Sequence, residues 1–125
     1  MYIIDTHALL WYLRNSGDLS ELALNTINTT ELIYTSVASL WEIAIKQSIG
    51  KLDLDFSITQ IENLCNEKDI QILPIKSKHL DKLKNLPKYH GDPFDRLIIS
   101  QALTENLTII TRDSTIPNYP VRTLW

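Results

Sequence analysis

The chain has 125 residues, a formal net charge of −3 and a single cysteine. This length suits one domain with its own hydrophobic core, so we expect residues 1–125 to form a single domain. The lone Cys65 excludes an intrachain disulfide and fits a reducing cytoplasm, and the net negative charge argues against a protein that coats nucleic acid. No apolar run approaches the roughly 20 residues of a membrane span, so we expect neither a membrane anchor nor a signal peptide.

Short β-branched runs alternate with segments of helical periodicity along the chain. Strands are predicted at 2–5, 32–35, 70–75, 107–111 and 121–124. Helices are predicted at 6–14, 18–28, 36–49, 57–68, 77–85 and 92–105. Strands that alternate with helices indicate an α/β fold, in which a parallel sheet of four to five strands is covered by helices on both faces.

The third predicted helix carries a broad apolar stripe. Ser36 is expected to open it and Gly50 to end it. The residues expected to face the core are Val37, Leu40, Trp41, Ala44, Ile45 and Ile49. Glu42 interrupts this apolar segment.

Acidic residues occur at four notable places in the chain. Two follow strands, one interrupts an apolar helix and one begins a helix. Asp5 and Asp113 each follow a predicted buried strand, Glu42 lies about two turns into its helix, and Asp92 and Asp95 begin another helix. In parallel sheets, ligands bind at the carboxyl ends of the strands, near the point where the strand order reverses. If the strands before Asp5 and Asp113 are neighbours there, their carboxylates converge. Mg²⁺ and Mn²⁺ prefer such oxygen ligands, so the pattern predicts a metal-dependent phosphodiesterase.

Each acid also has a purely structural explanation. Asp5 and Asp113 are suitable helix or turn caps, and Asp92–Asp95 is a good helix start, with Asp at the N-cap followed by Pro and an acid at the third position. Glu42 can pair with Lys46 at the i,i+4 spacing. The expectation that all four places face one end of the sheet favours a shared site over four separate structural roles.

The basic residues are concentrated in the second half of the chain. Ten acids and four Lys or Arg residues lie up to Ile70, whereas five acids and eight Lys or Arg residues follow it. Five lysines between 76 and 88 are either a basic approach for a polyanion or a solvated helix face. The candidates for RNA contacts are Lys88, His90, Arg96 and Arg112, with Tyr89, Tyr119 and Trp125 as candidates for base stacking. His7 is expected to pack along its helix.

Four segments, read together, resemble a known family. They are Ile3–Trp11 (Ile-Ile-Asp-Thr-His-Ala-Leu-Leu-Trp), Ser39–Lys46 followed by Gly50-Lys-Leu, His90–Ala102 with its Asp-Pro-Phe-Asp-Arg core, and Ile109–Asp113 (Ile-Ile-Thr-Arg-Asp). In this order the chain resembles the PIN-domain family, specifically the VapC-type toxin ribonucleases of toxin–antitoxin pairs.

This resemblance implies a three-layer α/β/α sandwich and an acidic metal site. Asp5, Glu42, Asp95 and Asp113 take the catalytic and metal-binding positions of the family, and Asp92 and Thr111 are supporting residues. The resemblance also implies Mg²⁺ or Mn²⁺ as the cofactor, RNA as the substrate, a small antitoxin that occludes the groove, and a homodimer.

The expected mechanism follows from this set of acids. Asp5 and Asp95 hold the first metal directly, and Asp113 and Glu42 complete its shell or hold a second ion. The metal orients the scissile phosphate and activates a bound water. Because clustered acids repel one another, at least one should have a raised pKa without metal.

Two other classes remain open at this point. One is an α/β domain in which an aspartate accepts a phosphoryl group, and the other is a non-catalytic binding module. A phospho-acceptor signalling domain needs an acceptor Asp after the third strand, but Lys76-Ser77 follows Ile75. An aspartyl-nucleophile phosphatase needs Asp-x-Asp after the first strand, but position 7 is His. The stronger alternative is a non-catalytic PIN-like module that binds RNA or protein and shows no magnesium-dependent stabilisation.

Overall fold

The computed structural model describes residues 1–125 as one parallel sheet with helices on both faces. The strands are β1 (Tyr2–Ile4), β2 (Ile33–Ser36), β3 (Ile70–Leu73), β4 (Thr108–Ile110) and β5 (Thr123–Leu124). The helices are α1 (Thr6–Leu13), α2 (Glu21–Thr29), α3 (Val37–Ser48), α4 (Ile58–Glu67), α5 (Ser77–Lys84) and α6 (Pro93–Glu105), with a 3₁₀ helix η1 (Ile116–Asn118). The predicted α/β fold is confirmed, including the fifth strand. None of the helices has the length and hydrophobicity needed to cross a membrane.

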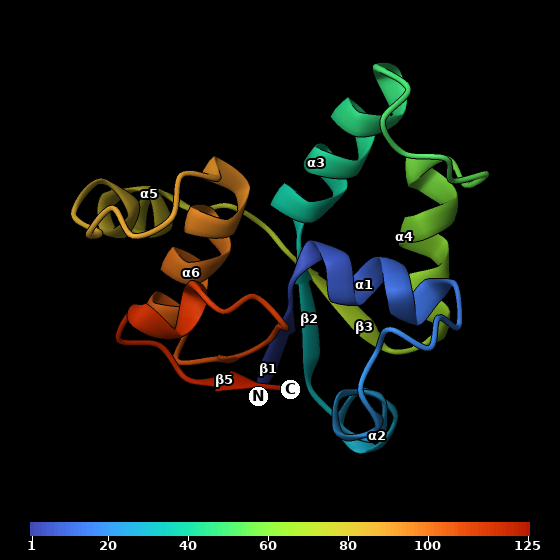
Figure 1. The fold of residues 1–125 in the computed structure, drawn as a ribbon, viewed down its shortest axis with the longest axis horizontal. Helices are drawn as coiled ribbons and strands as arrows, with labels where there is room; N and C mark the ends of the chain where they lie inside the picture. Colours follow the sequence, from blue (N-terminus) through green and yellow to red (C-terminus); the bar gives the residue numbers. More distant parts are fainter.

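Helices lie on both faces of the sheet (Figure 1), and each face buries its own hydrophobic cluster. Successive residues of a strand point to opposite faces, so Ile4 and Ile110 join the cluster formed with α1, α2, α3 and α4. Ile3 and Ile109 join the cluster formed with α6 and η1. The middle layer is therefore apolar on both sides, as a parallel sheet requires.

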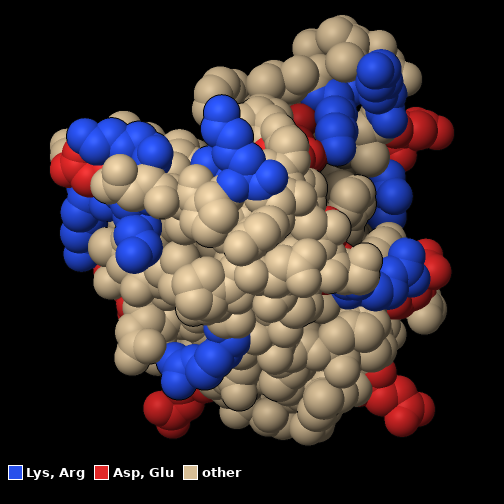
Figure 2. Space-filling view, turned by 60° about the vertical axis from the view of Figure 1, so that its left-hand side comes forward, with Lys and Arg blue, Asp and Glu red and all other residues tan.

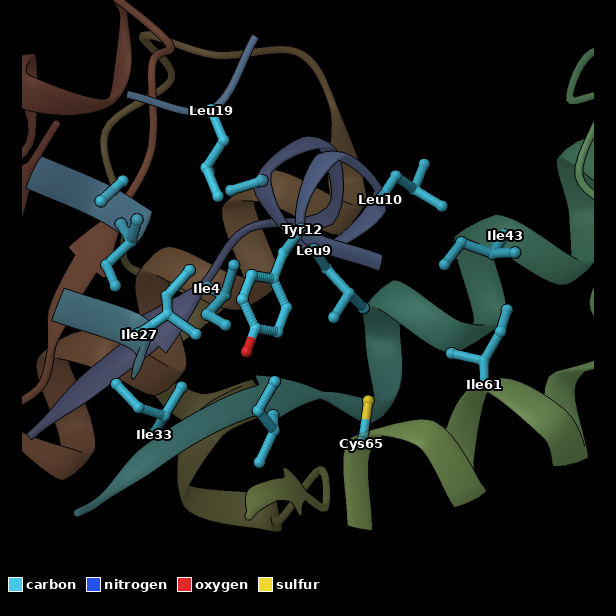
Figure 3. Packing of buried hydrophobic residues seen from close by; sticks show 14 of the residues in the cluster. Ile4, Leu9, Leu10, Tyr12, Leu19, Ile27, Ile33, Ile43, Ile61 and Cys65 are labelled. Carbon is cyan, nitrogen blue, oxygen red and sulfur yellow. The ribbon is translucent and has the colours of Figure 1, made fainter. Parts of the chain in front are cut away.

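The larger cluster fixes α1, α3 and α4 against one another (Figure 3). Ile43 of α3 and Ile61 of α4 have no exposed surface, and neither does Cys65 of α4. Full burial of one such aliphatic side chain stabilises the fold by roughly 1.5–3 kcal/mol. This packing holds the amino-terminal part of α3, which carries Glu42, close to α1.

The helix starts follow from short polar side chains at their N-caps. Ser20 caps α2, since the Ser20 hydroxyl accepts a hydrogen bond from the Ala23 N–H at 3.0 Å. Ser36 caps α3 as predicted, and Gly50 follows its end with a φ of 71°, a conformation that glycine adopts without steric cost.

The predicted core face of α3 is wrong in part. Trp41, Ile45 and Ile49 are exposed, whereas Leu40 and Ile43 are buried, together with the polar residues of the same face. Apolar residues occupy most of the helix circumference here, so periodicity alone did not identify the side that meets the core. Trp41 instead packs edge-on against Phe94 of α6, with the ring centroids 5.0 Å apart.

The strand order is β3-β2-β1-β4-β5, so the order reverses next to β1. Chain connections run outward from β1 to β2 and β3 on one side, and β4 and β5 lie on the other. Ile4 pairs in register with Ile110, and the Asp5 N–H donates to the Ile110 carbonyl at 3.1 Å. The carboxyl ends of β1 and β4 are therefore neighbours at the switch point, as predicted for the strands before Asp5 and Asp113.

Candidate metal centre

Asp5 lies directly after β1 with 4% of its surface exposed. Its Oδ1 accepts a hydrogen bond from the Ala8 N–H at 2.8 Å, so it also caps α1. Burial raises the pKa of Asp5 despite opposing hydrogen bonds from the Thr111 hydroxyl and the Ala8 N–H. The residue therefore has the capping role considered from the sequence and also presents a buried carboxylate at the sheet edge.

Asp113 is held in the turn that follows β4. Its N–H donates to the Thr111 hydroxyl at 3.0 Å, and its Oδ1 accepts from the Thr115 N–H at 2.7 Å. Burial acts to raise the pKa of Asp113, but the hydrogen bonds from His90 and Thr115 outweigh it and lower the pKa. Thr111 thus contacts both Asp5 and Asp113, which fits its predicted supporting role.

Asp95 lies in the first turn of α6, which Asp92 caps. Asp92 Oδ1 accepts from the N–H groups of Phe94 at 2.8 Å and Asp95 at 3.1 Å. Burial, followed by the charge of Asp92, raises the pKa of Asp95 to about 7, and the charges of Asp5 and Glu42 act in the same direction. The four predicted acids are therefore close enough to interact electrostatically.

Glu42 reaches the centre from α3 and is only 3% exposed. One carboxylate oxygen, Oε2, pairs with Lys46 Nζ at 2.7 Å. The other, Oε1, is buried without any hydrogen-bond partner. An unsatisfied buried polar atom costs about 1–3 kcal/mol or more when charged, and a bound cation would remove this cost. The donor set of buried carboxylate oxygens therefore fits a hard divalent cation.

His90 joins the acids at closer range than the sequence indicated. Its Nε2 lies 2.9 Å from Asp113 Oδ2 and 3.1 Å from Asp95 Oδ2. These three ligand atoms lie within 4.8 Å of one another. The predicted role of His90 was a phosphate contact, and its position two residues before Asp92 gave no sign of a bridge between Asp95 and Asp113.

The second ring nitrogen of His90 restricts the role of the first. His90 Nδ1 accepts from the Asp92 N–H at 3.1 Å, which places the hydrogen of the neutral ring on Nε2. Burial acts to lower the pKa of His90, but the contacts with Asp113 and Asp95 outweigh it and raise the pKa. In either form Nε2 donates, so His90 ties the two carboxylates together.

The predicted RNA-contacting residues are found in different environments. Arg96 donates to the Pro87 carbonyl at 2.7 Å and to the Tyr119 hydroxyl at 3.2 Å, so it braces the loop before α6. Tyr119 is 2% exposed and belongs to the core, whereas Tyr89 and Lys88 are exposed. Lys88, His90 and Arg96 nevertheless line one cavity of about 350 Å³ beside the acids.

The lysine-rich segment does not form a continuous basic strip. Lys78 pairs with Glu105 at 2.9 Å, and Lys84 lies 3.4 Å from Asp81. Figure 2 shows the basic side chains in separate groups with uncharged surface between them. The solvated helix face considered from the sequence describes most of these lysines.

His7 packs along its helix as expected, but at the surface of the protein. It is exposed, and its ring stacks on Trp11 with 5.8 Å between the centroids. His7 and Trp11 line a cavity of about 230 Å³ together with Asp5, Arg112 and Asp113. The sequence did contain a signal for this contact. His7 and Trp11 are four residues apart in the helix that follows Asp5, and residues at this spacing lie on the same face of a helix.

A model of the PIN domain family matches residues 2–121. The chain belongs to the PIN domain family. No curated protein matches the sequence. Among solved structures, the chain resembles VapBC2 from Rickettsia felis bound to a promoter DNA fragment, with a TM-score of 0.71, 16% identity, and 98% and 96% of the two chains covered. FitAcB from Neisseria gonorrhoeae gives a TM-score of 0.70 at 16% identity over 100% and 97% of the chains.

A third structure with this PIN fold is a toxin–antitoxin complex from Klebsiella pneumoniae. It gives a TM-score of 0.68 at 13% identity, with 100% of this chain and 97% of that chain covered. At these identities the similarity establishes the shared fold alone.

Proposed function

We propose that this PIN-domain protein is a metal-dependent endoribonuclease and the toxin of a type II toxin–antitoxin pair. The observation that carries the proposal is the buried Glu42, which has one carboxylate oxygen without a hydrogen-bond partner and whose charge acts on Asp95. Asp5, Asp95 and Asp113 come from three other places in the sequence. Four helix caps or isolated ion pairs do not explain a buried carboxylate oxygen without a partner.

Mg²⁺ or Mn²⁺ is the proposed cofactor, held by Asp5, Glu42, Asp95 and Asp113. When bound, the ion orients a scissile phosphate, activates water and neutralises developing negative charge. Carboxylate oxygens are the appropriate ligands for both ions.

The remaining side chains position these carboxylates. Thr111 contacts Asp5 and Asp113, Asp92 fixes the backbone of Asp95, and Lys46 orients Glu42. His90 donates between Asp95 and Asp113 and reduces their repulsion. Such supporting contacts hold reactive groups in place before the substrate binds, so less reorganisation is needed during the reaction.

The toxin role and its partners are inferred from the structural neighbours, which are toxin–antitoxin complexes. A protein partner also accounts for the exposed apolar residues of α3, namely Trp41, Ile45 and Ile49. Exposed apolar surface of this kind is typical of protein contacts. We therefore propose a small antitoxin as the partner, a homodimer as the state of the toxin, and the cytoplasm as the place where it meets RNA.

The test is cleavage of a pool of structured and single-stranded RNA by the purified protein with Mg²⁺, with Mn²⁺ and with chelator. Asp5→Asn is prepared in parallel, and Asp55→Asn is the matched control because Asp55 is exposed outside the centre. We expect cleavage that requires metal, is lost in Asp5→Asn and persists in Asp55→Asn. If the wild-type protein shows neither cleavage nor metal-induced thermal stabilisation, the non-catalytic module is supported instead.

A further inference from the structure

We propose that the cavity beside Trp11 is a subsite for one unpaired RNA base next to the metal centre. Its walls are Asp5, His7, Trp11, Arg112 and Asp113, and its volume is about 230 Å³. The proposal rests on the ribonuclease function proposed above and adds the way in which the substrate is held. It assigns a binding role to His7 and Trp11, which lie outside the acid cluster.

Planar side chains form one part of the cavity wall. His7 and Trp11 are neighbours on α1, with their ring planes inclined by 24°. The Arg112 guanidinium lies 4.4 Å from the centroid of the Trp11 ring. Trp125 contacts Trp11 at 61° between the ring planes, so one edge of the Trp11 ring is supported by another aromatic residue. Flat aromatic and guanidinium surfaces are the groups on which unpaired bases stack.

Arg112 is held mainly by this stacking arrangement. Its side chain is 55% exposed, and its nearest carboxylate, on Asp18, lies 4.0 Å away. At that distance the pair is at the limit of an ion pair, so the N–H groups of Arg112 remain available to RNA. Arg96, by contrast, uses its N–H groups on backbone carbonyls.

The acidic part of the wall connects the subsite to the proposed metal centre. Asp5 and Asp113 line this cavity and also belong to the acid cluster. A nucleotide whose base stacks beside Trp11 therefore places a neighbouring phosphate at the metal-binding carboxylates. A paired base is stacked within a duplex and cannot enter, so this geometry selects single-stranded RNA or loops. Stacking is tolerant of base identity because every base has an aromatic face.

The experiment measures binding of fluorescein-labelled RNA tetranucleotides by anisotropy, in chelator so that no cleavage occurs. A second probe of the same length lacks the bases but keeps the ribose–phosphate backbone and its charge. We compare the wild-type protein with Trp11→Leu, Trp11→Phe and Arg112→Gln. Trp41→Leu is the control because it removes the same kind of aromatic side chain from an exposed position that does not line the cavity.

The wild-type protein should bind the RNA more tightly than the abasic probe. Loss of one stacked base contact corresponds to roughly a 5- to 100-fold weaker affinity, which we expect for Trp11→Leu and, in the lower part of that range, for Arg112→Gln. Trp11→Phe should recover part of the affinity, and Trp41→Leu should match the wild type. Arg112 is exposed, so its variant tests the subsite even if Trp11→Leu fails to fold.

Equal binding of RNA and abasic probe by the wild type would overturn the proposal, as would a folded Trp11→Leu or Arg112→Gln protein with unchanged affinity. Binding and cleavage separate the two proposals. Base-dependent binding without any RNA cleavage supports the subsite and contradicts the ribonuclease function. Metal-dependent cleavage without base-dependent binding supports the nuclease and contradicts the subsite.

Discussion

The raised pKa of Asp95 predicts that this carboxylate destabilises the metal-free fold at neutral pH. Burial and the charge of Asp92 raise its pKa from 3.8 to about 7, and its side chain is 18% exposed. A difference of about three pKa units corresponds to roughly 4 kcal/mol, because each unit is worth 1.36 kcal/mol. Asp95→Asn removes the charge and retains the shape, and its amide oxygen still accepts from His90. We therefore expect this variant to gain about 2–4 kcal/mol in free energy of unfolding at pH 8 without metal.

The pH dependence follows from the direction of the shift. The unfolded chain loses the Asp95 proton near pH 4, whereas the folded protein keeps it until about pH 7. Between these values the folded state binds more protons than the unfolded state, so wild-type stability falls as the pH rises. The advantage of Asp95→Asn should thus be absent near pH 4, grow up to about pH 7, and stay constant above it.

The measurement is urea unfolding in chelator from pH 4 to 8, followed by circular dichroism. Asp55→Asn is again the control, because this exposed acid should change stability by no more than about 0.5 kcal/mol at any pH. RNA cleavage by Asp95→Asn should be lost although the protein is more stable. A stability difference that is independent of pH, or a loss of stability at pH 8, would refute the assignment of a buried, repelled carboxylate.

Two further predictions concern metal binding and the loop before α6. Glu42→Gln should bind Mn²⁺ at least about 10-fold more weakly than the wild type, because a carboxylate ligand is replaced by a neutral amide. Isothermal titration calorimetry measures this affinity. An unchanged affinity would show that Glu42 is not a metal ligand. Arg96→Gln should lose about 1–3 kcal/mol of unfolding free energy in urea, since its hydrogen bonds to the Pro87 carbonyl and the Tyr119 hydroxyl are lost. Arg112→Gln should stay within about 0.5 kcal/mol of the wild-type value. Equal losses in the two variants would contradict the bracing role of Arg96.

The sequence was sufficient to predict the fold because its local signals agree with one another. The β-branched strand runs, the Ser36 cap and Gly50 mark elements that the structure confirms at nearly the same bounds. The convergence of Asp5 and Asp113 also followed from a general rule for parallel sheets. Neither conclusion depends on how the side chains pack against one another.

Side-chain environments were harder to predict because they depend on contacts between distant segments. Arg96 and Arg112 look alike in the sequence, but one donates to backbone carbonyls and the other stacks on Trp11. The exposed side of α3 was missed because apolar residues such as Trp41 occur all around this helix. Likewise, the bridge that His90 makes depends on the meeting of α6 with the turn after β4.

The cost of the acid cluster is itself an argument for its function. A buried Glu42 oxygen without a partner and an Asp95 with a pKa near 7 both reduce the stability of the metal-free protein. Replacement of either by a neutral residue of similar size would relieve this cost without changing the fold. Thr111 and Asp92 meanwhile hold the acids close to one another rather than letting them separate. Repelling carboxylates that are held together in this way support the divalent-cation site proposed above.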